Sequence, residues 1–171
     1  MPCTIAADGL SFCFPDGWEA TKFDDWAFYR NQFSKAHKEI KAVDILALSP
    51  DKATLWLIEV KDFRAHPRTK SIPLQEEIWK KVFDTLAALL PAGVHATGHE
   101  QQFARAAGRV KNIRVVFHGE QPVKHRSLFP QSYTPADIQQ KFKALFKAID
   151  PRALVVSSRT MPARIPWTVQ P

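Results

Sequence analysis

Three charged residues lie in two segments that are otherwise apolar. Asp44 stands in AVDILAL, and Glu59 and Lys61 stand in LWLIEVKDF. An unpaired charge buried in such a segment costs several kcal/mol, so these charges need partners. A pair of carboxylates with a backbone carbonyl and waters is the ligand set that a hard cation such as Mg²⁺ prefers.

The two segments have the pattern of a β-hairpin. Residues 42–48 and 55–62 are short runs rich in Val, Ile, Leu and Trp, and the turn-forming stretch SPDKAT separates them. If the turn is centred between Asp51 and Lys52, the numbers of cross-strand partners sum to 103.

That register brings the three charges together. Asp44 then faces Glu59, and Lys61 lies on the same face because side chains alternate with period two. Opposed carboxylates about 5 Å apart repel each other and need a compensating cation or a proton. Lys61 can neutralise one of them, and a divalent metal can neutralise both.

The elements downstream of the hairpin alternate between helix and strand. Residues 74–90 carry apolar residues at helical spacing, and Pro91 and Gly93 predict the end of that helix. The other predicted elements are a helix over 99–108, a strand in NIRVVFHG (112–119), a helix from the N-cap Thr134 and Pro135 to Asp150-Pro151, and a strand in ALVVSS (153–158). We expect the aromatic residues at core spacing to serve in packing: Trp56, Trp79, Phe83, Phe142 and Phe146.

The first forty residues are harder to assign. SFCFPDG indicates a strand that ends in a Pro-Asp-Gly turn, and WEATKFDDWAFYRNQF favours further strands. The alternative is a helix, because Trp26, Tyr29, Phe33, Ala36 and Ile40 also fall at helical spacing.

Length and composition indicate one α/β domain over residues 1–157, with a mixed central β-sheet flanked by helices. Residues 158–171 are predicted to form a Pro-rich extended tail. The 171 residues are 45% hydrophobic, which is enough for one core. Two cysteines are too few for a disulfide framework, and no segment approaches the roughly 18 apolar residues of a membrane span. We therefore expect a soluble, cytoplasmic protein.

The net charge of +7 favours an anionic partner, with nucleic acid, and DNA in particular, as the first expectation. No phosphate-binding glycine loop, nucleophile elbow or zinc-type spacing is present in the sequence. No membrane partner is expected, and a homodimer is left open.

Asp44, with fourteen residues between it and Glu59-Val60-Lys61, resembles the Asp…(Asp/Glu)-X-Lys signature of the PD-(D/E)XK nuclease superfamily. The resemblance covers roughly residues 40–120 and implies a restriction-endonuclease-like core. It implies metal-dependent hydrolysis of phosphodiester bonds, with Mg²⁺ or Mn²⁺ held by Asp44, Glu59 and the Val60 carbonyl. Lys61 would position or deprotonate the attacking water.

The chain departs from that pattern in two places. Val43 stands where the signature has proline, and the acidic residue usual on an N-terminal helix has no clear equivalent. Glu19, Asp25 and Glu39 are the candidates for it.

Basic residues follow the motif in KDFRAHPRTK. The functional interpretation is that Arg64, Arg68 and Lys70 contact phosphates, and the alternative is a solvated loop. Some nucleases of the family support the site with a polar residue on the next helix, where Lys81 and Asp84 are the candidates.

Two further interpretations remain open at this stage. Glu59 and Lys61 could form a salt bridge on an edge strand, worth only about 0–1 kcal/mol if exposed. The chain could also be a non-catalytic domain that binds nucleic acid or protein and retains the nuclease-like fold.

Overall fold

A five-stranded mixed sheet forms the centre of the molecule in the computed structural model, which describes residues 2–122 and 131–171. Its strands stand in the order β3-β4-β5-β6-β7. β4 pairs antiparallel with β3 and β5, whereas β5, β6 and β7 run parallel. The bounds are β3 Glu19–Lys22, β4 Ile45–Leu48, β5 Thr54–Asp62, β6 Asn112–Glu120 and β7 Leu154–Val156.

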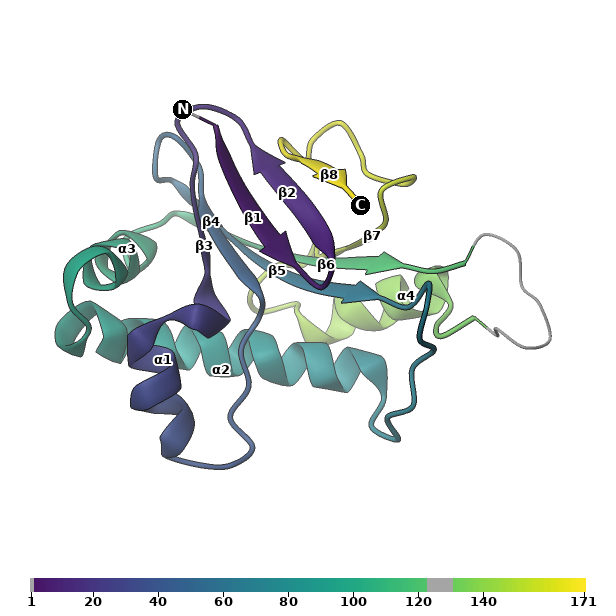
Figure 1. Cartoon of the computed structure of the whole chain (residues 1–171), viewed down its shortest axis with the longest axis horizontal. Helices are drawn as coiled ribbons and strands as arrows, with labels where there is room; N and C mark the ends of the chain where they lie inside the picture. The colour runs from purple at the N-terminus through teal and green to yellow at the C-terminus, as the bar shows by residue number, and fades with distance from the viewer. Residues whose placement is uncertain (1, 123–130) are drawn as a thin grey trace.

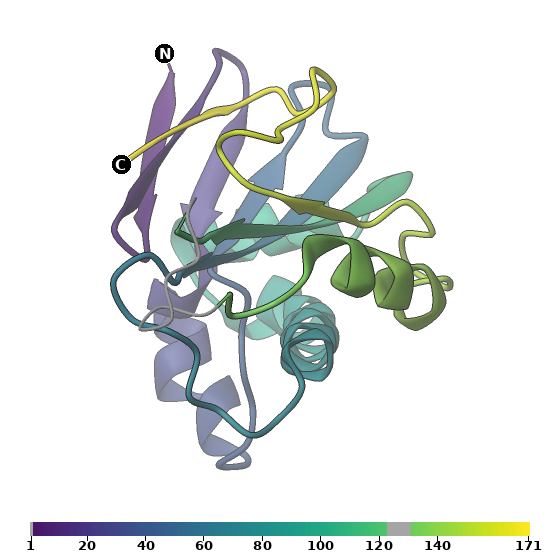
Figure 2. The ribbon, with the colours of Figure 1, turned by 90° about the vertical axis from the view of Figure 1, so that its right-hand side faces the viewer.

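The two faces of this sheet carry different layers, as Figures 1 and 2 show. Helices lie on one face, and a small sheet of order β1-β2-β8 lies over the other. The bounds of the small sheet are β1 Cys3–Ala7, β2 Leu10–Phe14 and β8 Thr168–Gln170. The helices are α1 Ala27–Asn31, α2 Leu74–His95, α3 Gly98–Ala107 and α4 Pro135–Leu145, with 3₁₀ turns at Phe23–Asp25 (η1) and Phe33–Lys35 (η2).

Each face of the central sheet has its own apolar core. Leu46, Leu55 and Leu57 point toward the helices and pack with α2 and α3. Ile45 and Ile58 point the other way, into a core shared with the small sheet. The alternation of side chains along β4 and β5 therefore decides which charges face the helices. The predicted α/β class with a mixed central sheet flanked by helices is confirmed.

The predicted hairpin register is also confirmed. Ile45 pairs with Ile58 and Leu46 with Leu57, which is the pairing that follows from a turn between Asp51 and Lys52. Lys52 takes a positive φ of 56° in that turn.

The helix predicted to stop at residue 90 continues to His95 through Pro91. Its last turn lies against α3, where Arg105 Nε donates to the Gly93 carbonyl at 2.7 Å and Gln101 Nε2 donates to the Val94 carbonyl at 2.9 Å. Side chains of a neighbouring helix thus satisfy the carbonyls at the helix end, and this tertiary packing overrides the stop signal.

The segment after residue 22 forms helical turns where strands were favoured. β3 ends at Lys22, and η1, α1 and η2 follow it. Phe23 and Phe28 are buried against the main core, so the helical spacing of aromatic residues determines this structure.

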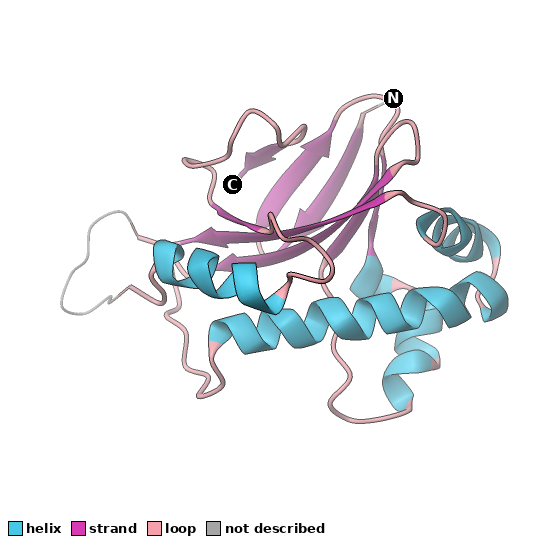
Figure 3. Cartoon of the chain, turned by 180° about the vertical axis from the view of Figure 1, so that it is seen from behind, coloured by secondary structure: helices cyan, strands magenta, loops and turns pink. Residues whose placement is uncertain are grey.

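The predicted tail packs back onto the domain. β8 pairs with β2, as the view from behind in Figure 3 helps to follow. Trp167 is buried between the two sheets. The last fourteen residues therefore complete a core. No helix in residues 2–122 and 131–171 has the length and apolar character needed to cross a bilayer.

Candidate functional site

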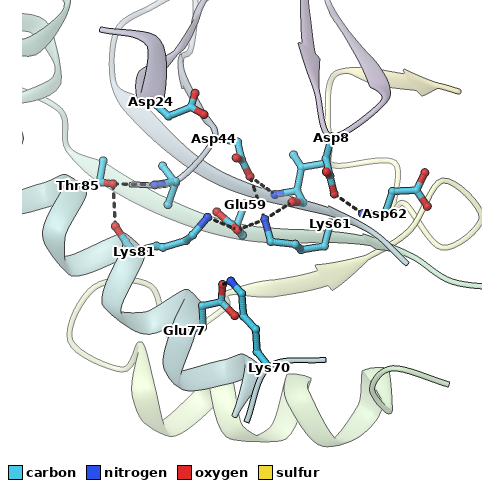
Figure 4. Close-up of polar contacts among 12 residues, drawn as sticks. Asp8, Asp24, Asp44, Glu59, Lys61, Asp62, Lys70, Glu77, Lys81 and Thr85 are labelled. Carbon is cyan, nitrogen blue, oxygen red and sulfur yellow. Dashed lines mark hydrogen bonds and ion pairs between the residues drawn. The ribbon is translucent and has the colours of Figure 1, made fainter. Parts of the chain in front are cut away.

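Charged side chains from three elements meet on the helix-facing side of the central sheet (Figure 4). Asp44 immediately precedes β4, Glu59 and Lys61 lie on β5, and Lys81 reaches up from α2. The sequence-based prediction that Asp44, Glu59 and Lys61 share one face agrees with this arrangement.

The ammonium of Lys61 lies among three oxygen atoms. Its Nζ is 2.7 Å from Glu59 Oε1, 3.9 Å from Asp44 Oδ2 and 2.9 Å from the carbonyl oxygen of Val60. Burial lowers the pKa of Lys61, but Glu59 and Asp44 outweigh it and the pKa is raised overall. The three oxygens thus converge on a point where a cation is stabilised. They belong to the residues predicted to hold a metal.

Glu59 is the most deeply buried charge of the group, with a side chain 1% exposed. Its Oε1 also accepts from Lys81 Nζ at 2.6 Å, whereas Oε2 is buried and has no partner among the described residues. Burial first and Asp44 second raise the pKa of Glu59 to about 7, although Lys81 and Lys61 oppose the shift. The carboxyl group therefore has one oxygen left for a further ligand.

Asp44 is held by the backbone of the neighbouring strand. Its Oδ2 accepts from the Val60 amide at 2.7 Å, which fixes the carboxylate beside the end of β5. The loop before β4 is held in turn by Thr85 on α2, because the Val43 amide donates to Thr85 Oγ1 at 3.0 Å. The Thr85 hydroxyl then donates to the Lys81 carbonyl at 2.7 Å.

Helix α2 contributes one of its two candidate polar residues to the site. Of the two candidates on that helix, Lys81 reaches the site, whereas Asp84 accepts from the Lys41 amide at 2.9 Å and pairs with Lys80 at 3.0 Å. Sequence reasoning missed Thr85, because a single threonine among apolar helix residues carries no signal of its hydrogen bonds.

Sequence reasoning also missed Asp24. Burial raises its pKa, and among the charges acting on it Lys22 lowers and Asp44 raises that pKa. Its Oδ1 is buried and has no partner within the described ranges. Figure 4 draws Asp24 on η1, above Asp44.

The three acids proposed from the sequence for the upstream position lie elsewhere or have other contacts. Glu19 pairs with Lys52 and with His99, and Asp25 lies 3.5 Å from Lys22. Glu39 lies in the loop between η2 and β4. Asp24 is the residue of this region whose pKa the charge of Asp44 helps to raise.

The oxygen atoms around Lys61 form part of the ligand set that a hard cation requires. In the part of the chain that the structure describes, no three side chains of His, Cys, Asp or Glu form a metal-binding group. Two carboxylates and one carbonyl do converge, and the second oxygen of Glu59 is unpartnered. This partial oxygen set suits Mg²⁺, which keeps several waters and uses one or two carboxylates.

The basic segment after β5 contains internal ion pairs. Arg64 binds Asp62 through two guanidinium nitrogens, and Arg68 Nη1 lies 2.6 Å from Glu77 Oε2. Lys70 pairs with the other oxygen of Glu77. The Arg68 side chain is largely buried by these contacts, while Arg64 and Lys70 remain exposed. Their contact with phosphates stays a prediction.

A second buried polar pair lies on the opposite face of the sheet. His118 Nε2 is 2.9 Å from Glu120 Oε1, which also accepts from the Ser158 amide at 2.6 Å. Burial lowers the pKa of His118, so the pair ties β6 to the segment after β7 without a permanent cation. Lys124, His125 and Arg126, which follow this strand in the sequence, lie outside the described residues.

Comparison with known proteins gives one partial similarity. No protein-family model matches the chain, and no solved structure matches it significantly. A cysteine–tRNA ligase of Neisseria meningitidis is 31% identical over 172 aligned positions, covering 82% of this chain and 24% of the ligase. The chain thus spans about a quarter of the length of that curated relative, and the similarity assigns no family.

Proposed function

We propose that the protein is a metal-dependent nuclease that hydrolyses phosphodiester bonds of nucleic acid. The observation that carries the proposal is the convergence of Asp44 Oδ2, Glu59 Oε1 and the Val60 carbonyl on the ammonium of Lys61. The proposal includes a restriction-endonuclease-like core, built from β4, β5, α2 and β6.

The residues would divide the work as follows. Asp44, Glu59 and the Val60 carbonyl would hold Mg²⁺ or Mn²⁺, and Asp24 would add negative charge next to Asp44. The metal would lower the pKa of a bound water and stabilise charge on the phosphate. Lys61 reaches the same point and, because Glu59 and Asp44 raise its pKa, would orient the attacking water as an ammonium.

Lys81 would serve in positioning Glu59. Its ammonium holds Oε1 at 2.6 Å and thereby directs the carboxyl group within a buried environment. Because it also opposes the raised pKa of Glu59, it favours the ionised form that a metal requires.

One observation favours the alternative of a non-catalytic binding domain. Glu59 Oε1 is contacted by both Lys61 and Lys81, and Asp44 lies within 3.9 Å of Lys61. Two cations thus face two carboxylates, which balances the charges without a metal. A test must therefore measure metal binding and not only activity.

The decisive experiment is a calorimetric titration with Mg²⁺ and Mn²⁺, paired with cleavage assays on single-stranded DNA, duplex DNA and RNA. The RNA substrates include tRNA, because the similar segment belongs to a protein named as a tRNA ligase. We expect wild type to bind metal and cleave at least one substrate, and Glu59→Gln to do neither. Glu76→Gln, an exposed change on α2, is the matched control.

Two results would count against the proposal. Wild type that binds no divalent cation at millimolar concentration and cleaves nothing would favour the non-catalytic binding domain. Cleavage retained in a folded Glu59→Gln variant would place the chemistry at another site.

A further inference from the structure

Helix α2 carries a second apolar face that points away from the sheet. Leu74, Ile78, Val82, Thr85 and Leu89 are buried toward the core, whereas a second row of five apolar residues is exposed except at Leu86, which is partly buried against the core. We name this the outer stripe, and it consists of Trp79, Phe83, Leu86, Leu90 and Val94. These residues recur at spacings of three and four, so they form one continuous ridge along the helix.

The outer stripe is exposed over most of its length. Leu90 is 81% exposed and Val94 60%, and the two aromatic side chains are 36% and 38% exposed. The sequence predicted Trp79 and Phe83 as core residues, and this prediction is wrong. Contiguous apolar surface of this kind on a soluble domain marks an interaction site.

The two aromatic residues form a stacked, partly exposed pair at one end of the stripe. The Trp79 and Phe83 rings stack with their centroids 4.3 Å apart and an interplanar angle of 30°. Each ring therefore supports the other in a fixed position. A partly exposed aromatic pair of this kind is a typical anchor at protein interfaces.

The other end of the stripe borders an apolar groove. Leu86, Leu90 and Val94 line it together with α3, and the groove has a volume of about 370 Å³. Gly93 lines the groove without a side chain, and Cγ of Arg105 lies 3.5 Å from where a Cβ of Gly93 would stand. The charged residues lining this groove are Arg105 and Arg109, so it is apolar with a positive rim.

We propose that the outer stripe binds a second copy of this chain, with the two α2 helices antiparallel across a two-fold axis. In this arrangement Trp79 of each copy enters the groove beside Leu90 of the other. An axis between Asp84 and Thr85 pairs Trp79 with Leu90 and Phe83 with Leu86. A self-complementary surface of this kind, with an exposed aromatic pair and an apolar groove on the same helix, is what a two-fold dimer needs.

Charge supports the antiparallel orientation. The same register places Glu76 of one copy opposite Gly93 of the other, next to which Arg105 lies. The negative start of α2 thus meets the positive rim of the partner's groove. A parallel pairing would instead place like charges together, which disfavours it.

The interface leaves the candidate site of each copy accessible. Lys81 and Thr85, which contact the site, lie on the side of α2 that faces the sheet, opposite the outer stripe. Dimerisation does not depend on the proposed nuclease activity, and each copy would retain its own site.

The first test is the mass of the protein as a function of concentration, measured by sedimentation and light scattering. We expect wild type to pass from one chain to two between micromolar and hundreds of micromolar concentration. Trp79→Lys and Leu90→Glu should each remain one chain over this range, with unchanged helix content. Ala6→Glu places a charge at an exposed position of β1 in the other layer and should dimerise like wild type.

The second test uses the two variants together. In a mixed dimer of Trp79→Lys and Leu90→Glu, one native Trp–Leu pair remains and the other position pairs lysine with glutamate. The mixture should therefore form a dimer although neither variant does so alone. Wild type that stays monomeric at every concentration, or single variants that still dimerise, would overturn the proposed interface. A mixture of the two variants that stays monomeric would overturn the antiparallel register.

Discussion

Lys61 Nζ and Glu59 Oε1 lie 2.7 Å apart on the helix-facing side of β5, in a segment that is otherwise built for burial. This ion pair explains how the buried strand tolerates both residues, because each side chain neutralises part of the other's charge. It does not explain why Glu59 retains a buried oxygen without a partner among the described residues. The ion pairs with Lys61 and Lys81 do not use that oxygen, whereas the proposed metal would.

Replacing Lys61 should affect turnover and metal binding differently. Lys61→Met removes a positive charge from the centre of the oxygen cluster and leaves Asp44, Glu59 and the Val60 carbonyl in place. Metal affinity should be retained or increased, while turnover falls by about 10²-fold or more, the scale for an acid–base group. Calorimetry and single-turnover cleavage measure the two properties separately.

The matched comparison is Asp44→Asn, which should lose both properties. If Lys61→Met lost metal binding to the same extent as Asp44→Asn, Lys61 would be a structural partner of the carboxylates and not a group that acts on water.

The pH dependence of stability should report on Glu59. Its pKa is raised from 4.5 in the unfolded chain to about 7 in the folded protein, so the folded state binds the extra proton between these values. The free energy of unfolding contributed by this group is therefore greatest below pH 4.5, falls as pH rises toward 7, and is constant above.

Urea unfolding of wild type and Glu59→Gln at pH values from 5 to 8 measures this contribution. The difference between the two proteins should change across the window and level off above it. A difference that is flat from pH 5 to 8 would show that Glu59 is ionised throughout and that the lysines dominate its environment.

The candidate cluster could be predicted because its geometry is local. A turn between Asp51 and Lys52 fixes the hairpin register, and the period of two along each strand then fixes which side chains share a face. Neither step needs information from distant parts of the chain. The position of Lys81 required more, since it depends on how α2 packs across β5.

Other features depend on tertiary contacts that the sequence does not display. α2 passes through Pro91 because Arg105 and Gln101 of α3 bind its last carbonyls. Trp79 fits a core pattern by spacing, yet α2 has more apolar residues than one face can bury. Asp24 stands next to Asp25 in the sequence, and the turn η1 decides which of the two lies near Asp44.

Thr85 should be important for stability through one hydrogen bond. Thr85→Val keeps the shape of the side chain but leaves the Val43 amide without its acceptor, in a region where both residues are fully buried. We expect a loss of about 1–3 kcal/mol in the free energy of unfolding.

Thr134→Val is the control for that change. Thr134 precedes α4 and its side chain makes no capping hydrogen bond, so its replacement should change stability by about 0.5 kcal/mol or less. Equal losses in the two variants would mean that the Thr85 bond contributes little.

The basic segment after β5 can be tested by its salt dependence. Replacing Arg64 or Lys70 with glutamine should weaken binding to duplex DNA and flatten the dependence on salt by about 0.9 log units per lost phosphate contact. Arg68→Gln should act differently, since it breaks the buried pair with Glu77 and lowers stability.

Fluorescence anisotropy at several salt concentrations, in buffer without divalent cations, measures the slope apart from cleavage. An unchanged slope for both Arg64→Gln and Lys70→Gln would identify the segment as a solvated loop that makes no phosphate contact.

The C-terminal segment should be an integral part of the domain because of Trp167. Its ring is 2% exposed and lies 5.2 Å from Phe14 and 5.1 Å from Trp56, measured between centroids. Trp167→Ala opens a cavity between the two sheets and should cost about 3–5 kcal/mol of unfolding free energy. Thr168→Ala, at an exposed neighbouring position of β8, should cost about 0.5 kcal/mol or less.

Trp167→Phe distinguishes lost packing from lost hydrogen bonding. The indole Nε1 is buried and has no partner among the described residues, so removing it forfeits no bond. The phenylalanine variant should therefore retain most of the stability that alanine loses, as measured by urea unfolding. If Trp167→Ala were as stable as wild type, residues 158–171 would be an independent tail, as the sequence first indicated, and the core between the two sheets would hold without them.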